Sequence, residues 1–288
     1  MKLALGTVQF GLPYGIANQH GQVTRQEAKA ILALAGANGI DTLDTAISYG
    51  ESEACLGEVG VDGFNIITKL PAVPDNCINI NDWVQYNVAS SLSRLGVSKI
   101  YGLLLHRSEQ LLEDYGDTLY QSLKNLKDIG AVEKIGVSIY DPEELEVIIN
   151  KFSLDLIQAP FNLIDRRLYT TGWLQKLKDN GIEIHTRSVF LQGLLLLSKD
   201  AIQAKFMPWN NLWSKWHTWL SEQNVSAIQA CLEYPLSFSD IDRVVVGTDS
   251  VRQLQQIIDA TRNESQLDLP DLECISEDLI NPSRWSQL

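Results

Sequence analysis

The chain alternates short, nearly continuous apolar runs with longer segments in which apolar residues recur every three or four positions. Short apolar runs of this kind are typical of parallel strands covered on both faces, whereas the longer spacing is typical of helices with one buried face. The expected strands are Leu3–Val8, Ile40–Thr45, Phe64–Lys69, Ile100–Leu105, Lys134–Ile139, Leu154–Ala159, Ile182–Ser188 and Arg243–Gly247.

The segments between these runs carry helix start signals. Thr24 and Glu27 have the spacing of a capping box, and Asp141 precedes Pro142 as a cap precedes a proline at the first helical position. Beyond the helices that follow these two caps, we expect helices over residues 82–95, 118–129, 166–180 and 250–261. Eight strands alternating with helices favour a closed (β/α)8 barrel over an open sheet, and with no linker we expect residues 1–288 to form one domain.

Two segments interrupt the alternation: Gly11–Val23, which is rich in turn-forming residues, and Phe190–Pro235, which is rich in tryptophan. Trp209, Trp213 and Trp216 are spaced so that they share one helix face. The simpler interpretation is a helix that packs on the barrel. The alternative is an aromatic wall of a substrate pocket above the barrel mouth.

Composition and charge narrow the partners. The chain is 45% hydrophobic and 20% charged, which favours a folded core over disorder. Its formal net charge of -13 repels nucleic acid and anionic membrane, so we expect neither as a partner. We expect a cytoplasmic location, because the N-terminus lacks a signal-peptide pattern, no apolar run is long enough for a membrane span, and the four cysteines form no C-x-x-C pair.

The common cofactor and metal motifs are absent from the sequence. His20, His106, His185 and His217 are isolated and form no zinc pattern, so we expect no metal site. The sequence contains neither Gly-x-Gly-x-x-Gly nor a Walker run, and Ser138 lies in G-V-S-I-Y rather than in the G-x-S-x-G of a hydrolase elbow.

Four ionisable residues lie at or just after three consecutive expected strands. Asp44 and Tyr49 belong to the run D-T-A-I-S-Y-G, Lys69 ends the next strand, and His106 follows the strand after that. Because parallel barrel strands present their carboxyl ends at one rim, we expect these side chains to form one site. Glu51 and Glu53 are also close in sequence, but acids at this position suit the first turn of the next helix.

This set of residues suits protonation of a carbonyl oxygen. A tyrosine ordinarily titrates near pH 10, and a neighbouring ammonium is expected to lower that value. A buried carboxylate beside Lys69 would keep the lysine charged and oriented. His106 could orient a carbonyl oxygen or relay a proton.

These motifs resemble those of the aldo-keto reductase family. The run D-T-A-x-x-Y-G, the strand end T-K at Lys69 and the L-x-x-H that ends at His106 are similar to the family's tetrad signature. The resemblance continues in Gly136-Val137-Ser138, in Gln158 and in Val245-Val246-Gly247-Thr248, and so covers nearly the whole chain.

The resemblance implies a (β/α)8 barrel that reduces a small carbonyl substrate with NADP, although NAD is possible. Tyr49 would be the general acid, tuned by Lys69 and Asp44, and His106 would orient the substrate. Ser138 and Gln158 would hold the nicotinamide carboxamide. The cofactor-binding residues implied in this way are Gly6, Thr7, Val8, Ser138, Gln158, Arg187, Ser188, Gly247, Thr248, Asp249 and Arg252.

The sequence departs from the family pattern at the cofactor. Ile139 replaces the usual asparagine after G-V-S, and Arg187 replaces a tyrosine that stacks on the nicotinamide ring in many members. Asp249 would repel a 2′-phosphate, and Arg252 is the only cation nearby in the sequence, so we expect NADP with only a slight preference over NAD. These departures leave two alternatives open: a cofactor-binding regulatory protein without turnover, and a sugar dehydrogenase or epimerase with the same tetrad.

Overall fold

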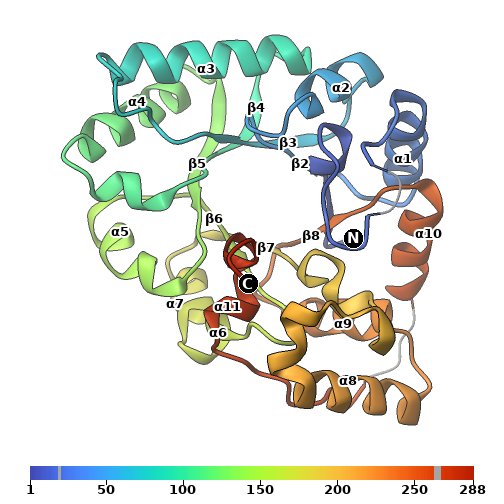
Figure 1. Ribbon diagram of the computed structural model, residues 1–288. Coiled ribbons are helices and arrows are strands. Elements are labelled where there is room, and N and C mark those ends of the chain that lie inside the picture. The colour runs from blue at the N-terminus through green and yellow to red at the C-terminus, as the bar shows by residue number, and fades with distance from the viewer. Residues whose placement is uncertain (19–20, 263–266) are drawn as a thin grey trace.

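Eight parallel strands close into one barrel in chain order, and the helices form a ring around it (Figure 1). The computed structural model describes residues 1–18, 21–262 and 267–288. This confirms the (β/α)8 barrel expected from the sequence, and the strands differ from the expected ranges only at their ends. They are β1 (Leu3–Gly6), β2 (Thr42–Asp44), β3 (Asn65–Leu70), β4 (Ile100–Leu105), β5 (Val132–Ser138), β6 (Leu156–Pro160), β7 (Glu183–Arg187) and β8 (Arg243–Gly247).

The helices are α1 (Arg25–Ala37), α2 (Ser52–Val59), α3 (Ile80–Leu95), α4 (Gly116–Asp128), α5 (Leu145–Lys151), α6 (Arg167–Thr170), α7 (Trp173–Asp179), α8 (Asn210–Gln223), α9 (Ala227–Leu236), α10 (Val251–Ala260) and α11 (Glu277–Ile280). Several helices begin at a side-chain cap, namely α1, α3, α9 and α10. The Thr24 hydroxyl accepts a hydrogen bond from the Glu27 amide, and Asp141 and Glu144 complete a capping box before a short 3-10 turn.

The expected helix over residues 166–180 is wrong as one element. It is divided into α6 and α7, and Gly172 between them adopts a left-handed conformation with φ 80°. Glycine reaches this region at little cost, whereas a continuous helix would need a negative φ there. The helix pattern was therefore correct on both sides of an unrecognised break.

The strand register brings the carboxyl ends of the strands to one rim. Gly6 at the end of β1 is opposite both Asp44 on β2 and Gly247 on β8. Across the barrel, Ser138 on β5 is paired with Gln158 on β6. The inside of the barrel is filled lower down by apolar side chains, namely Ile67, Leu104 and Leu156, so the rim is the part that remains open to polar groups.

Helix α8, which carries Trp213, Trp216 and Trp219, packs on the outside of the barrel and lies at the outer edge of Figure 1. Trp213 and Trp216 are each 1% exposed, and their indole N–H groups donate to the backbone oxygens of Phe206 and Leu195. Trp216 also stacks on Trp219, with ring centroids 5.9 Å apart. In the described part of the chain, no helix has the length and apolar character needed to cross a membrane.

Candidate functional site

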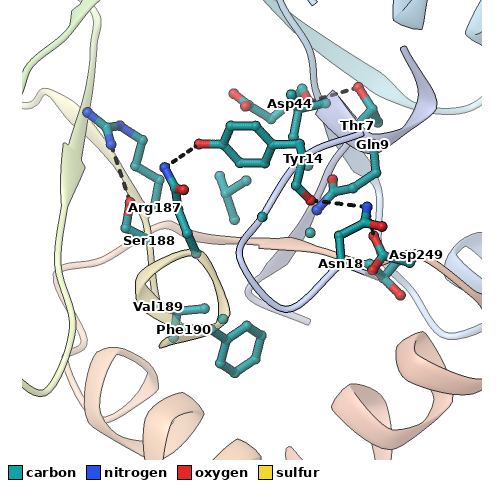
Figure 2. A pocket seen from close by; sticks show the side chains of 18 of the residues that line it. Thr7, Gln9, Tyr14, Asn18, Asp44, Arg187, Ser188, Val189, Phe190 and Asp249 are labelled. Carbon is teal, nitrogen blue, oxygen red and sulfur yellow. Dashed lines mark hydrogen bonds between the residues drawn. The ribbon is translucent and has the colours of Figure 1, made fainter. Parts of the chain in front are cut away.

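A cavity of about 540 Å³ opens at the rim formed by the strand ends (Figure 2). Asp44, Tyr49 and His106 line it, whereas Lys69 lies behind them and is fully buried. No tryptophan in the described residues lines the cavity, so the expectation of an aromatic wall was wrong and the packing interpretation is correct. The residues expected at the cofactor that line it are Gly6, Thr7, Val8, Ser138, Gln158, Arg187, Ser188, Gly247, Thr248 and Asp249.

Arg252 is the one expected cofactor residue outside this group. Its side chain is exposed, and it is not among the residues that line the cavity. Arg252 lies in the first turn of α10, where neighbouring side chains point in different directions around the helix axis. The role of Arg252 at the cofactor stays a prediction.

Asp44 and Lys69 form a buried ion pair at the centre of the rim. The Lys69 ammonium lies 2.7 Å from Asp44 Oδ1 and donates to the Thr45 backbone oxygen at 2.9 Å. The second carboxylate oxygen accepts a hydrogen bond from the Gln158 amide at 2.6 Å. Because both charged groups have polar partners, the pair can exist in a place where an isolated charge would be strongly disfavoured.

Tyr49 and His106 meet in front of this ion pair. Their rings make an edge contact with centroids 5.8 Å apart, and the Lys69 ammonium lies 5.2 Å from the Tyr49 ring centroid. Among the described residues, the Tyr49 hydroxyl makes no hydrogen bond, and Tyr49 lines the cavity. A phenolic proton is therefore directed at the cavity with a cation and an imidazole nearby.

The pKa of Tyr49 is shifted in the direction opposite to the sequence expectation. Burial raises it, the Asp44 carboxylate raises it further, and the Arg187 guanidinium opposes the shift. Lys69 was expected to lower this pKa, but its ion pair with Asp44 at 2.7 Å compensates its charge. The phenol therefore keeps its proton in the resting site, and Arg187 is the cation that acts on it.

Burial and nearby cations keep His106 neutral. Burial has the largest effect, followed by the charges of Lys69 and Arg187, and together they lower the pKa of His106 to about 4. The Nδ1 atom lies 3.2 Å from the Ser48 hydroxyl. Burial also lowers the pKa of Lys69, which its contact with Asp44 opposes. At neutral pH the imidazole can thus offer one N–H and one lone pair without carrying charge.

Arg187 is held at the rim by polar groups of the barrel. Its guanidinium donates to the Ile139 backbone oxygen at 2.8 Å and to the Ser188 hydroxyl at 3.3 Å, and it lies 4.6 Å from the Tyr140 ring centroid. Ile139 itself is fully buried, so its side chain offers the cavity nothing polar. The charged side chain that replaces the family's stacking tyrosine is therefore fixed in place.

The two loops that interrupt the alternation of strands and helices both contribute to the cavity, but the sequence did not indicate which of their residues do so. Tyr14, from the Gly11–Val23 insertion, lines the cavity, and its hydroxyl accepts a hydrogen bond from the Gln192 amide at 2.9 Å. Ser188, Leu191 and Gln192 all have positive φ values, of 63°, 46° and 52°. Such strain in residues other than glycine persists where the surroundings impose it, often at functional sites. The only sequence signals were the turn-rich insertion and the break after β7.

The described residues contain no group of three or more His, Cys, Asp or Glu side chains that could hold a metal ion. The cavity instead combines one buried ion pair, a protonated phenol, a neutral imidazole and several amides. This combination can donate a proton to an oxygen atom and can form hydrogen bonds with a polar ligand.

Comparison with known proteins places the chain in a family. The sequence matches the model of the Aldo/keto reductase family over residues 2–277. It is 25% identical over 256 residues to the uncharacterized oxidoreductase YqkF of Bacillus subtilis (strain 168), covering 82% of each protein.

Solved structures share the same architecture. The chain superimposes on aldo-keto reductase AKR11C1 from Bacillus halodurans with a TM-score of 0.74 and 18% identity, covering 92% of this chain and 88% of that one. For PA4992 of Pseudomonas aeruginosa the TM-score is 0.67 at 23% identity, covering 90% and 88%. At these identities the structural matches establish the barrel fold, and the family match rests on the sequence.

Proposed function

The chain belongs to the aldo/keto reductase family of oxidoreductases, and from this premise we propose that it reduces a small aldehyde or ketone to an alcohol with NAD(P)H. We also propose that residues 1–288 act as one domain. Family members generally use NAD(P)H and act on small carbonyl compounds, which supports both the cofactor and the substrate class.

The residues that line the cavity fit a nicotinamide dinucleotide. Gln9 Oε1 is buried and has no hydrogen-bond partner among the described residues, so it is suited to accept a bond from a ligand amide or hydroxyl. A Cβ atom on Gly247 would lie 2.6 Å from Gln9 Nε2, so glycine keeps this space open. Ser138 and Gln158, which contact each other only at 3.4 Å, would hold the carboxamide.

When bound, the dinucleotide supplies the hydride that reaches the carbonyl carbon. Tyr49 then gives its phenolic proton to the carbonyl oxygen, so that the alcohol gains one hydride and one proton. The resulting phenolate is stabilised by Arg187, whose charge opposes the raised pKa of Tyr49. Solvent returns the proton to Tyr49 after the product leaves.

His106 orients the carbonyl oxygen as a neutral donor. If the Ser48 hydroxyl donates to Nδ1, the imidazole proton resides on Nε2, from which it can point at the substrate oxygen. Asp44 and Lys69 act mainly as a rigid, neutralised support, because the pair fixes the ammonium beside the phenol while Gln158 fixes the carboxylate.

The observation that carries this proposal is the Tyr49 hydroxyl at the cavity, with a lysine 5.2 Å from its ring and a histidine ring at 5.8 Å. The test is the oxidation of NADH and NADPH by the purified protein with a panel of small aldehydes, ketones and open-chain sugars. Turnover of at least one carbonyl is expected. Dinucleotide binding without turnover on any of them would contradict the proposal.

A further inference from the structure

We propose that the end of the cavity over α10 selects NAD(H) over NADP(H). There, protein acceptors already occupy three backbone amides, those of Asp249, Ser250 and Val251, that could otherwise hold a 2′-phosphate. The proposal rests on the nicotinamide-dependent function proposed above, and it concerns the end of the cavity remote from Ser138 and Gln158. It replaces the slight preference for NADP expected from the sequence.

The cavity extends from the barrel centre outward over α10. Ser138 and Gln158 line it at β5 and β6, whereas Asp249, Gln253 and Gln256 line it at the β8–α10 connection and further along α10. Figure 2 shows Asn18 and Asp249 on the opposite side of the cavity from Arg187 and Ser188. A dinucleotide whose nicotinamide lies at Tyr49 would therefore place its adenosine ribose toward α10.

Three amides, from the β8–α10 connection and the first residue of α10, are already bonded to protein atoms. The Val251 N–H donates to a carboxylate oxygen of Glu27 at 2.7 Å, and the Asp249 N–H donates to Gln253 Oε1 at 2.7 Å. The Ser250 N–H donates to the Thr248 hydroxyl at 3.4 Å. A helix start ordinarily favours an anion, but here α1 supplies that anion as Glu27. A phosphate would have to displace it.

The charges around this end disfavour a 2′-phosphate. Glu27 and Asp249 are both acidic, and the Asp249 carboxylate accepts a hydrogen bond from the Asn18 amide at 3.4 Å. Of the described residues that line the cavity, Arg187 is the single Lys or Arg, and its guanidinium is bonded to the Ile139 oxygen after β5. A phosphate here would meet two carboxylates, whereas Arg252, the cation in the first turn of α10, is exposed and lies outside the cavity lining.

A free ribose hydroxyl fits the same place. Carboxylates accept hydrogen bonds from hydroxyl groups, and an acid that binds the ribose 2′-hydroxyl is a recurring feature of NAD sites on other folds. Asp249 supplies such an acceptor at the cavity surface, and Gln256 adds an amide nearby. The carboxylate favours the hydroxyl over a phosphate, whereas the amide can bond to either group.

Equilibrium binding tests this proposal without turnover. Calorimetric titration of the full chain with NADH and NADPH, and with 5′-AMP and adenosine 2′,5′-bisphosphate, isolates the effect of the 2′-phosphate. We expect NADH to bind at least about tenfold more tightly than NADPH, with the same order for the two fragments. The ratio should shrink as salt screens the carboxylates.

Two variants test which residues discriminate between NADH and NADPH. Glu27→Gln keeps an acceptor for the Val251 amide but removes the charge, and Asp249→Asn removes the second charge. Each should strengthen NADPH binding and reduce the NADH preference at least about threefold, with thermal unfolding as the folding control. Asp259→Asn, which removes an exposed charge at the other end of α10, should leave the preference unchanged.

Equal or tighter binding of NADPH by the native chain would overturn the proposal. So would an unchanged preference in both Glu27→Gln and Asp249→Asn. Failure of the chain to bind either dinucleotide has a different meaning, because it contradicts the proposed function on which this inference rests.

Discussion

The proposed catalytic rim (Asp44, Tyr49, Lys69 and His106) and the tryptophan helix α8 both bury polar groups, but the hydrogen bonds of these groups are satisfied differently. In α8 the indole N–H groups of the two buried tryptophans donate to backbone oxygens, so neither N–H is available to a ligand. At the rim the ion pair is satisfied, yet the Tyr49 hydroxyl faces the cavity without a protein partner among the described residues.

The burial pattern therefore distinguishes side chains that stabilise the fold from side chains that take part in the reaction. Where every buried donor has an acceptor, a side chain contributes to stability, and its removal should mainly lower the free energy of unfolding. Where a titratable group is buried but faces a cavity, its removal should mainly lower the rate of turnover. The predictions below test this separation.

The largest expected effect is on turnover in Tyr49→Phe. Removing the proton donor should lower kcat by about 10²–10⁴-fold, the range typical of general acid catalysis. Stability and dinucleotide affinity should stay close to the native values, because the hydroxyl has no hydrogen bond to lose among the described residues. Steady-state kinetics and binding titrations measure the two effects.

The matched control is Tyr120→Phe, which removes a hydroxyl that donates to the Ser153 oxygen outside the cavity. It should keep native turnover. Full activity in Tyr49→Phe would show that another group donates the proton.

Lys69→Met should reduce both stability and turnover. Breaking a buried ion pair leaves Asp44 uncompensated, and such changes cost about 3–5 kcal/mol in the free energy of unfolding. Urea unfolding measures this loss. Lys99→Met, which breaks an exposed pair with Glu133, should cost at most about 1 kcal/mol. Equal losses in the two variants would contradict the assigned burial.

Trp213→Ala should behave as a pure packing variant. Truncating a large buried aromatic side chain costs about 3–5 kcal/mol, and here the Phe206 oxygen also loses its donor. Dinucleotide affinity of the folded fraction, measured well below the unfolding temperature, should be unchanged. If the variant does not fold, Trp213→Phe provides the same comparison at a smaller cost. A selective loss of affinity with native stability would place α8 in the site.

The smallest expected effect is the pH dependence contributed by His106. Its pKa is lowered to about 4 in the native protein, while the unfolded chain binds a proton near the usual value of 6.5. Stability should therefore be retained above pH 6.5 and be lost as pH falls from 6.5 toward 4.

Urea unfolding at pH 7 and pH 4.5 measures this contribution by comparing the native chain with His106→Gln. The variant should lose less stability on acidification, with a difference on the order of 1 kcal/mol. An identical acid sensitivity would mean that His106 titrates normally in the folded protein.

The barrel and most of its site could be predicted because both depend on local pattern. Apolar runs define strands, and chain order places Asp44, Lys69 and His106 at one rim once the sheet closes. The same logic fails for side chains whose place depends on long-range contacts. Glu27 lies in α1 yet caps α10, and nothing in its sequence neighbourhood indicates that partner.

Electrostatic effects were also beyond sequence reasoning. Lys69 was expected to lower the pKa of Tyr49, but its charge is compensated by Asp44. The cation that opposes the rise in this pKa is Arg187, from a distant strand. The break at Gly172 and the strained residues after β7 depend on backbone conformations that residue type alone does not fix.

We propose that hydride moves from a nicotinamide to a carbonyl carbon in this cavity while Tyr49 protonates the oxygen. This transfer can be followed with NADH or NADPH deuterated separately on each face of nicotinamide C4, together with an aldehyde that the protein turns over. We expect one labelled form to place a single deuterium on the carbinol carbon, and Tyr49→Phe to slow its appearance greatly. An alcohol that carries deuterium from neither form would contradict hydride transfer from the nicotinamide.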